Sequence, residues 1–144
     1  MYFALPALAG AIGGAAIAAI GMVYSAATGR GLWSLPNSIG GIVLGPDVGD
    51  TRSLGLVTFL GICFHMVLSA LYGILIVLLA RGFGTGFIGT GIVVGIFVWL
   101  FNHFLAASVL PGAKKHAGFN PLWLAFGLHA LFGAITGGVA EALI

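Results

Sequence analysis

The chain has 144 residues, of which 60% are hydrophobic and only 6% are charged, with a formal net charge of +2. About a quarter of the residues of an ordinary soluble domain are charged, so this composition predicts that lipid rather than water covers most of the surface. The small net charge gives no indication of a nucleic-acid partner. Cys63 is the single cysteine, which excludes an intrachain disulfide and a C-x-x-C redox centre.

Four apolar segments are long enough to cross a hydrocarbon core about 30 Å thick. The first runs from Phe3 to about Ala27, and because no Lys or Arg precedes it we expect a membrane helix rather than a cleaved signal peptide. The second runs from Leu54 to Ala80, and the third from Phe87 to about Leu110. The fourth begins at Pro121, a residue that suits a first helical turn.

The longest connection, Gly29 to Arg52, has a mostly apolar middle in which Pro36 favours a break or a helix start. We expect an interfacial helix or a shallow re-entrant segment, with Trp33 at the depth of the lipid headgroups. A plain extension of the first helix is the alternative. The segment from Arg81 to Gly91 contains G-x-G-x-x-G, but it lacks the preceding strand and the acidic residue of a dinucleotide site, so we expect a tight turn followed by a glycine-rich helix start.

The last connection, Gly112 to Asn120, is expected to be a short basic loop whose lysines make at most a small contact with anionic lipid. Cations concentrate on the first and third connections and are nearly absent from the second. By the positive-inside tendency, the first and third connections are cytoplasmic and both termini lie outside the cytoplasm. The residues that carry this bias are Arg30, Arg52, Lys114 and Lys115, against Arg81 on the other side.

Two apolar helices each carry a histidine within a row of small residues at four-residue steps. A four-residue step is close to the helical repeat, so each row forms a stripe on one face. The first stripe is Gly61, His65, Ser69 and Gly73, and the second is Ala125, His129, Gly133 and Gly137.

The two halves of the chain share this plan. Each half opens with a glycine-rich helix, contains a cluster of Trp, Asn and Pro, and closes with a histidine helix. Gly10 and Gly14 have the spacing that lets helix backbones approach closely in lipid. We therefore predict an all-α membrane protein in which four transmembrane helices form one bundle, 1–144, as two tandem helix-pair repeats, 1–80 and 81–144. Such parallel repeats occur in transporters, among other folds.

Three stretches carry a resemblance to known proteins: Gly31–Asn37, His65–Gly73 and Pro121–Gly133. They resemble a group of small, uncharacterised four-helix bacterial membrane proteins, which pair a Trp and Pro turn with two helices containing His and Gly. The resemblance implies the fold and a location in the bacterial cytoplasmic membrane. It implies no activity.

The intramembrane histidines are the candidate functional groups, because ionisable residues in a bilayer are costly and usually face inward. Counted from the cation-rich ends of their helices, His65, His103 and His129 lie at depths that agree within about 6 Å. One interpretation is structural: a neutral imidazole bonds to a neighbouring helix, and such bonds average about 0.6 kcal/mol in membranes. The candidate partners are Asn37, Asn102, Ser69 and Ser108.

A tetrapyrrole is the alternative interpretation of the two stripes. His65 and His129 would be axial ligands of haem b, or one of them would bind a chlorophyll-type pigment. The small residues beside them, Gly61, Ser69, Ala125 and Gly133, would leave room for the ring. No Arg lies in these helices to pair with haem propionates. A metal site on the three histidines lacks a carboxylate or thiolate at matching depth, and a proton relay or solute path stays open.

Catalysis is poorly supported, because Asp47, Asp50 and Glu141 lie in loops or at a helix end and form neither a facing carboxylate pair nor a triad. Asp47, Asp50 and Arg52 are expected to form a solvated loop with at most a weak ion pair. We therefore expect a non-catalytic protein, an accessory or structural subunit that associates with other membrane subunits or with itself. The alternatives are haem or pigment binding and a small homo-oligomeric transporter or channel. The sequence leaves the cofactor open, with haem b as the candidate.

Overall fold

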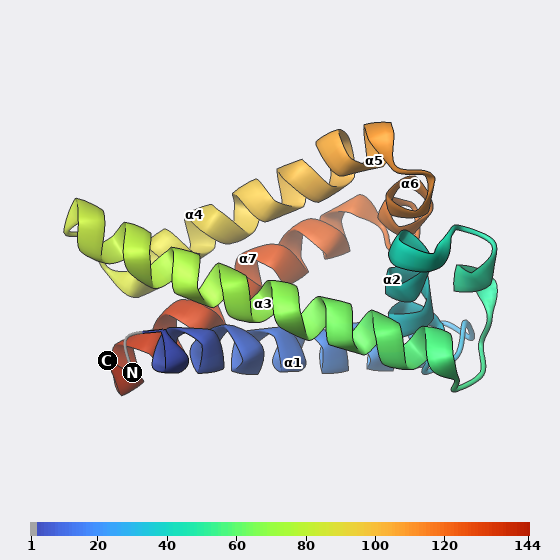
Figure 1. Cartoon of the computed structure of the whole chain (residues 1–144), viewed down its shortest axis with the longest axis horizontal. Coiled ribbons are helices and arrows are strands. Elements are labelled where there is room, and N and C mark those ends of the chain that lie inside the picture. Colours follow the sequence, from blue (N-terminus) through green and yellow to red (C-terminus); the bar gives the residue numbers. More distant parts are fainter. Residues whose placement is uncertain (1–2) are drawn as a thin grey trace. The chain divides into compact units, whose positions relative to one another are not determined.

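The computed structural model describes residues 3–144, which form helices joined by short connections and include no strand (Figure 1). Four helical segments are long and apolar enough to cross a membrane. They are α1 (Ala4–Ala27), α3 (Leu56–Phe83), the segment Phe87–Val109 and α7 (Leu122–Leu143). The all-α class and four long apolar helices of spanning length are therefore confirmed, with boundaries within a few residues of those expected.

The first connection folds as a separate helix, α2 (Ser34–Leu44). Helix α1 ends because Gly29 takes a positive φ of 77° and the amide of Arg30 donates to the carbonyl of Ser25 at 3.0 Å. This pairing closes a helix C-terminus and redirects the chain, and glycine adopts it without a steric penalty. The alternative that the first helix continues through this connection is wrong. A location of α2 at a membrane surface stays a prediction.

The third connection also contains a helix, α6 (Pro111–Ala117), so the predicted basic loop from Gly112 to Asn120 is wrong over most of its length. Pro111 occupies the first helical position, where its missing amide costs nothing and its fixed φ suits a helix. Leu110 before it is extended, with φ −114° and ψ 115°, as proline imposes on the residue that precedes it.

The third span is interrupted by a stretch of wider helical turns. It consists of α4 (Phe87–Leu100), the π-helical η2 (Phe101–Ala106) and α5 (Ala107–Val109). Short π-helical insertions are uncommon and are often found at functional sites. This one carries Asn102 and His103, and nothing in the apolar pattern of the sequence predicted it.

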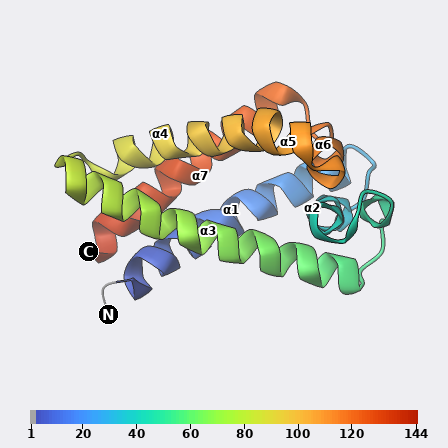
Figure 2. The ribbon, with the colours of Figure 1, turned by 45° about the horizontal axis from the view of Figure 1, so that its top comes forward.

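The described residues divide into two compact units, and each long helix contributes residues to both. Unit 1 comprises the chain up to Ile17 together with Met66–Trp99 and Phe126–Ile144, and unit 2 comprises Ala18–His65 and Leu100–Ala125. In unit 1, α3 and α4 are joined by a short turn (Figure 1). In unit 2, α2 packs against α6 and against the 3₁₀ turn η1 (Val48–Asp50), and α2 and α6 lie side by side (Figure 2).

Unit 1 has a small apolar core and wide apolar outer faces. Ile76, Val94 and Phe132 are buried together, and the ring of Tyr72 meets that of Phe132 edge to face at 6.4 Å. Large apolar side chains of α3 and α4 remain exposed, with Phe97 at 65%. Exposed apolar area on this scale is unfavourable in water and suits a lipid environment, so the four spans are compatible with a multi-pass membrane protein.

Candidate functional site

Within unit 1, α1 and α3 touch backbone to backbone. A Cβ placed on Gly10 would overlap the carbonyl oxygen of Ser69 and lie 2.9 Å from the Cα of Gly73. A Cβ placed on Gly73 would overlap the carbonyl oxygen of Pro6 and lie 2.6 Å from the amide nitrogen of Gly10. Backbone atoms cannot turn aside as a flexible side chain can, so only glycine allows this approach.

The second pair of spans, α4 and α7, touches in the same way. A Cβ on Gly91 would overlap the carbonyl oxygen of Gly133, and a Cβ on Gly133 would overlap the carbonyl oxygen of Gly91. A Cβ on Gly137 would overlap the carbonyl oxygen of Phe87 and lie 2.7 Å from the Cα of Ile88. Each of these glycines is therefore required by the neighbouring helix rather than by its own.

The two contacts correspond residue by residue. In each pair, one residue on the first helix and a glycine four positions later meet two residues, also four positions apart, on the second helix. Pro6 and Gly10 on α1 correspond to Phe87 and Gly91 on α4, and Ser69 and Gly73 on α3 correspond to Gly133 and Gly137 on α7. The last four residues are the ones that follow the two histidines at steps of four and eight.

These contacts fill the space that a tetrapyrrole was expected to use. Gly133 faces the backbone of α4, and a Cβ on Gly61 would overlap the carbonyl oxygen of Pro36 and lie 2.8 Å from the amide nitrogen of Gly40. Ser69 and Ala125 are 3% and 5% exposed. The small size of Gly61 and Gly133 is therefore explained by the neighbouring helices. The tetrapyrrole assignment stays a prediction.

The three sequence-predicted histidines are distributed over both units. His65 and His103 belong to unit 2, His129 belongs to unit 1, and all three side chains are half-buried. Within residues 3–144, no group of three or more His, Cys, Asp or Glu side chains is placed to hold a metal ion. Two residues expected as histidine partners bond elsewhere, because the hydroxyl of Ser108 donates to the carbonyl of Leu105 at 2.7 Å and Asn37 binds the backbone.

In unit 2, the side chain of Asn37 connects α2 to the start of α3 through hydrogen bonds. Its side chain is fully buried, and its amide group donates to the carbonyls of Thr51 at 2.7 Å and Ser53 at 3.0 Å. The hydroxyl of Thr58, which is also fully buried, donates to the side-chain oxygen of Asn37. A buried amide is costly unless its hydrogen bonds are made, and here they hold the loop after η1 in one conformation.

Cationic side chains of unit 2 gather around α2, and Arg30 is the best anchored of them. Its guanidinium carbon lies 4.4 Å from the ring centre of Phe119 and 5.3 Å from that of Tyr24. The same group donates to the carbonyl of Phe119, to Asn120 Oδ1 at 3.4 Å and to Thr28 Oγ1 at 3.2 Å. Stacking on two aromatic rings and three hydrogen bonds fix the position of this charge.

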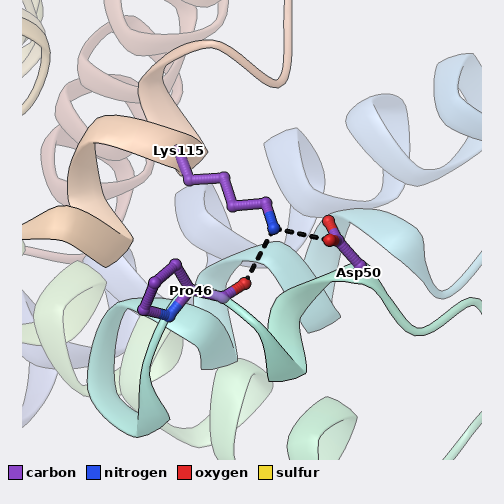
Figure 3. A network of polar contacts seen from close by, with 3 residues as sticks. All are labelled: Pro46, Asp50 and Lys115. Atoms are coloured by element: carbon purple, nitrogen blue, oxygen red, sulfur yellow. Dashed lines mark hydrogen bonds and ion pairs between the residues drawn. The ribbon is translucent and has the colours of Figure 1, made fainter.

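Lys115 on α6 reaches across to the segment after α2. Its Nζ donates to the carbonyl of Pro46 at 3.0 Å and pairs with Asp50 Oδ2 at 2.5 Å (Figure 3). The expected ion pair of Asp50 within its own loop is therefore corrected, because the partner comes from the third connection. The side chains are 42% and 69% exposed, so the pair stabilises the fold by only about 0–1 kcal/mol.

A close backbone contact brings the two short helices together. A Cβ on Gly112 of α6 would overlap the carbonyl oxygen of Gly41 and lie 2.8 Å from the Cα of Ile42. One turn away, Ser38 Oγ lies 2.8 Å from His116 Nδ1. The histidine predicted as part of a basic loop is thus held against a buried face of α2.

These elements line a partly open cavity of about 190 Å³ in unit 2, to which charged and hydroxyl side chains contribute the polar part. Three cations and one carboxylate line it, which gives a net charge of +3 − 1 = +2. Two hydroxyls from the first turns of α2 complete its polar lining. The charged and hydroxyl residues are Arg30, Arg52, Lys115, Asp50, Ser34 and Ser38.

The sequence alone did not identify this cavity as a site. The signal that could have found it is the placement of Arg30, Arg52 and Lys115 on two connections predicted to share one side of the membrane. The sequence predicted a loop in place of α6, and a loop would not hold Lys115 in a fixed position. Ser34 and Ser38 were missed because their roles depend on which face of α2 is buried.

Comparison with known proteins finds no match among family models, curated proteins or solved structures. The resemblance to small four-helix bacterial membrane proteins therefore stays a prediction.

Proposed function

We propose that this chain is an integral membrane protein without catalytic activity that serves as an accessory or structural subunit of a larger membrane complex. We place it in the cytoplasmic membrane of a bacterium, with the cation-rich first and third connections in the cytoplasm and both termini outside. Four spanning-length helices support the membrane location. The uneven distribution of Lys and Arg supports the orientation.

The observation that carries this proposal is an outward stripe on α7. A Cβ on Gly127 or on Gly138 would meet no atom within 4 Å, in contrast to Gly133 and Gly137 of the same helix. The two glycines are eleven positions apart, about three helical turns, so they share one face. Glycine weakens a helix by up to about 1 kcal/mol relative to alanine. In lipid, small residues on an outward face allow a second helix to approach closely, which is what a subunit contact requires.

The test is purification of the tagged protein from its native membranes in a mild detergent. We expect a stoichiometric membrane partner that is lost when Gly127→Leu and Gly138→Leu are combined. Gly89→Leu is the matched control, because Gly89 lies on α4 and also has no atom within 4 Å of its Cβ position. Retention of the partner by the double variant would refute the role of the stripe. Recovery of the chain alone would refute the subunit assignment.

We further propose that the two halves are tandem helix-pair repeats. Each half has the order long helix, short helix, long helix, as α1–α2–α3 and then as the third span, α6 and α7. The matching glycine contacts of α1 with α3 and of α4 with α7 support this pairing. If the pairs are equivalent, Gly73→Ala and Gly137→Ala should lower stability by similar amounts. A loss confined to one of them would indicate that the match is coincidental.

The repeat also favours the second candidate function, a small homo-oligomeric transporter, because parallel repeats occur in that class of proteins. The native-membrane purification separates the two candidates. A discrete homo-oligomer without other subunits would support the transporter and contradict the accessory subunit.

A further inference from the structure

We propose that the polar cavity of unit 2 binds the phosphate of an anionic phospholipid headgroup. Its six charged and hydroxyl residues carry a net charge of +2 and come from the first connection and from α6. This proposal does not depend on whether the protein associates with other subunits.

The size and donor set of the cavity suit phosphate. A volume of about 190 Å³ is smaller than the ~300–1,000 Å³ typical of pockets for drug-sized ligands. It therefore fits a compact group of a few heavy atoms. A guanidinium has five N–H donors, of which Arg30 uses three in the bonds described above, and an ammonium has three, of which Lys115 uses two. Both cations keep donors for a ligand.

Two of the three cations are held in place before any ligand arrives. Arg30 is stacked between Tyr24 and Phe119, and Lys115 is held by a carbonyl and a carboxylate (Figure 3). Ordering long side chains opposes binding, so side chains that are already ordered favour it. Within residues 3–144, the guanidinium of Arg52 makes one weak contact, in which its Nη1 lies 3.5 Å from the carbonyl of Gly29, so it can turn towards a ligand at little cost.

The position of the cavity residues favours a lipid as the source of the phosphate. Arg30 follows the end of α1 at Ala27 by three residues, and Arg52 precedes the start of α3 at Leu56 by four residues. The ends of membrane-spanning helices lie at the depth of the lipid phosphates. Anionic lipids in the cytoplasmic leaflet attract basic groups at this depth, and basic pockets near helix ends bind their headgroups.

Asp50 is the one cavity residue whose replacement should raise, rather than lower, the affinity for phosphate. Its carboxylate lines the cavity and would repel the phosphate, while it also occupies one donor of Lys115. Asp50→Asn removes the negative charge but keeps a side-chain oxygen that accepts from Lys115, so it should tighten binding, whereas loss of a cation should weaken it. A gain in affinity cannot come from misfolding, so this variant keeps the proposal testable if another variant fails to fold.

The experiment measures the thermal midpoint of the full-length protein in dodecyl maltoside as dihexanoyl phosphatidylglycerol is added. Dihexanoyl phosphatidylcholine and inorganic phosphate at equal ionic strength are the comparison ligands. We expect Arg52→Gln and Lys115→Gln each to weaken the apparent affinity about tenfold, as for loss of a charged hydrogen bond, and Asp50→Asn to strengthen it several-fold. Lys114→Gln is the matched control, because Lys114 carries the same charge on the same helix and does not line the cavity.

Each contrary outcome overturns a defined part of the proposal. Equal weakening by Lys114→Gln and Lys115→Gln would mean diffuse attraction to the basic surface rather than binding in the cavity. Equal effects of phosphatidylcholine and phosphatidylglycerol would refute selection for an anionic headgroup. A full shift produced by inorganic phosphate alone would replace the lipid with the free anion.

Discussion

Alanine in place of Gly133 should destabilise the protein, whereas the same change at Gly127 in the same helix should not. A Cβ on Gly133 would overlap the backbone of Gly91 and lie 2.9 Å from the amide nitrogen of Ile92, so α4 and α7 must separate. Forcing extra volume into a packed interior costs about 1–3 kcal/mol, and the cost is near the upper limit when rigid backbone is the obstacle. The higher helix propensity of alanine offsets up to about 1 kcal/mol of this loss in stability. The expected net loss is therefore about 2 kcal/mol.

At Gly127 the only expected effect of alanine on stability is its higher helix propensity, because no atom lies within 4 Å of the added Cβ. Gly127→Ala should therefore be neutral or should stabilise the protein by up to about 1 kcal/mol. Thermal unfolding in detergent, followed by circular dichroism, measures both changes. A loss of about 2 kcal/mol corresponds to a fall of about 6 °C for a chain of this size. A Gly133→Ala variant as stable as the wild type, or equal losses at both positions, would refute the backbone contact between α4 and α7.

Asn37→Ala should cost about 3 kcal/mol, because it removes three hydrogen bonds of a fully buried residue. Asn120→Ala removes one 3.4 Å contact and should cost less than about 0.5 kcal/mol. Equal melting points of the two variants would contradict this. Thr136 Oγ1 is buried with no hydrogen-bond partner among residues 3–144. Thr136→Val removes this unsatisfied hydroxyl, so it should leave the stability unchanged or raise it by up to about 1 kcal/mol. A lower denaturation midpoint would contradict this. The purified protein should lack a Soret absorbance band. A band that disappears in His65→Ala would instead establish the tetrapyrrole.

The long helices could be predicted from the sequence because lipid simplifies the pattern. A run of about 20 apolar residues predicts a helix of spanning length almost regardless of its partners, and the four long apolar helices begin and end within a few residues of the predicted positions. The turn at Gly84 followed from its glycines, and its φ of 64° is a value that few other residues adopt.

The short helices were harder to predict because their stability comes from tertiary contacts. Seven residues with two adjacent lysines have little intrinsic helix preference to separate α6 from a loop. What fixes this helix is the contact of Gly112 with the backbone of Gly41, together with the bond between Ser38 and His116. These pairs lie 71 and 78 positions apart in sequence, so no local pattern contains them, and the cavity could not be predicted for the same reason.

The histidine stripes illustrate how one pattern can have two physical origins. Small residues at steps of four from a histidine allow a flat tetrapyrrole ring to approach the helix closely. They equally allow a neighbouring helix to approach. In α7, the residues four and eight positions after His129 are Gly133 and Gly137, and both meet the backbone of α4. The carbonyl of His129 itself faces Gly95, where a Cβ would overlap it. The glycines of the two stripes are therefore accounted for by helix packing, whereas the imidazole side chains still require a functional explanation.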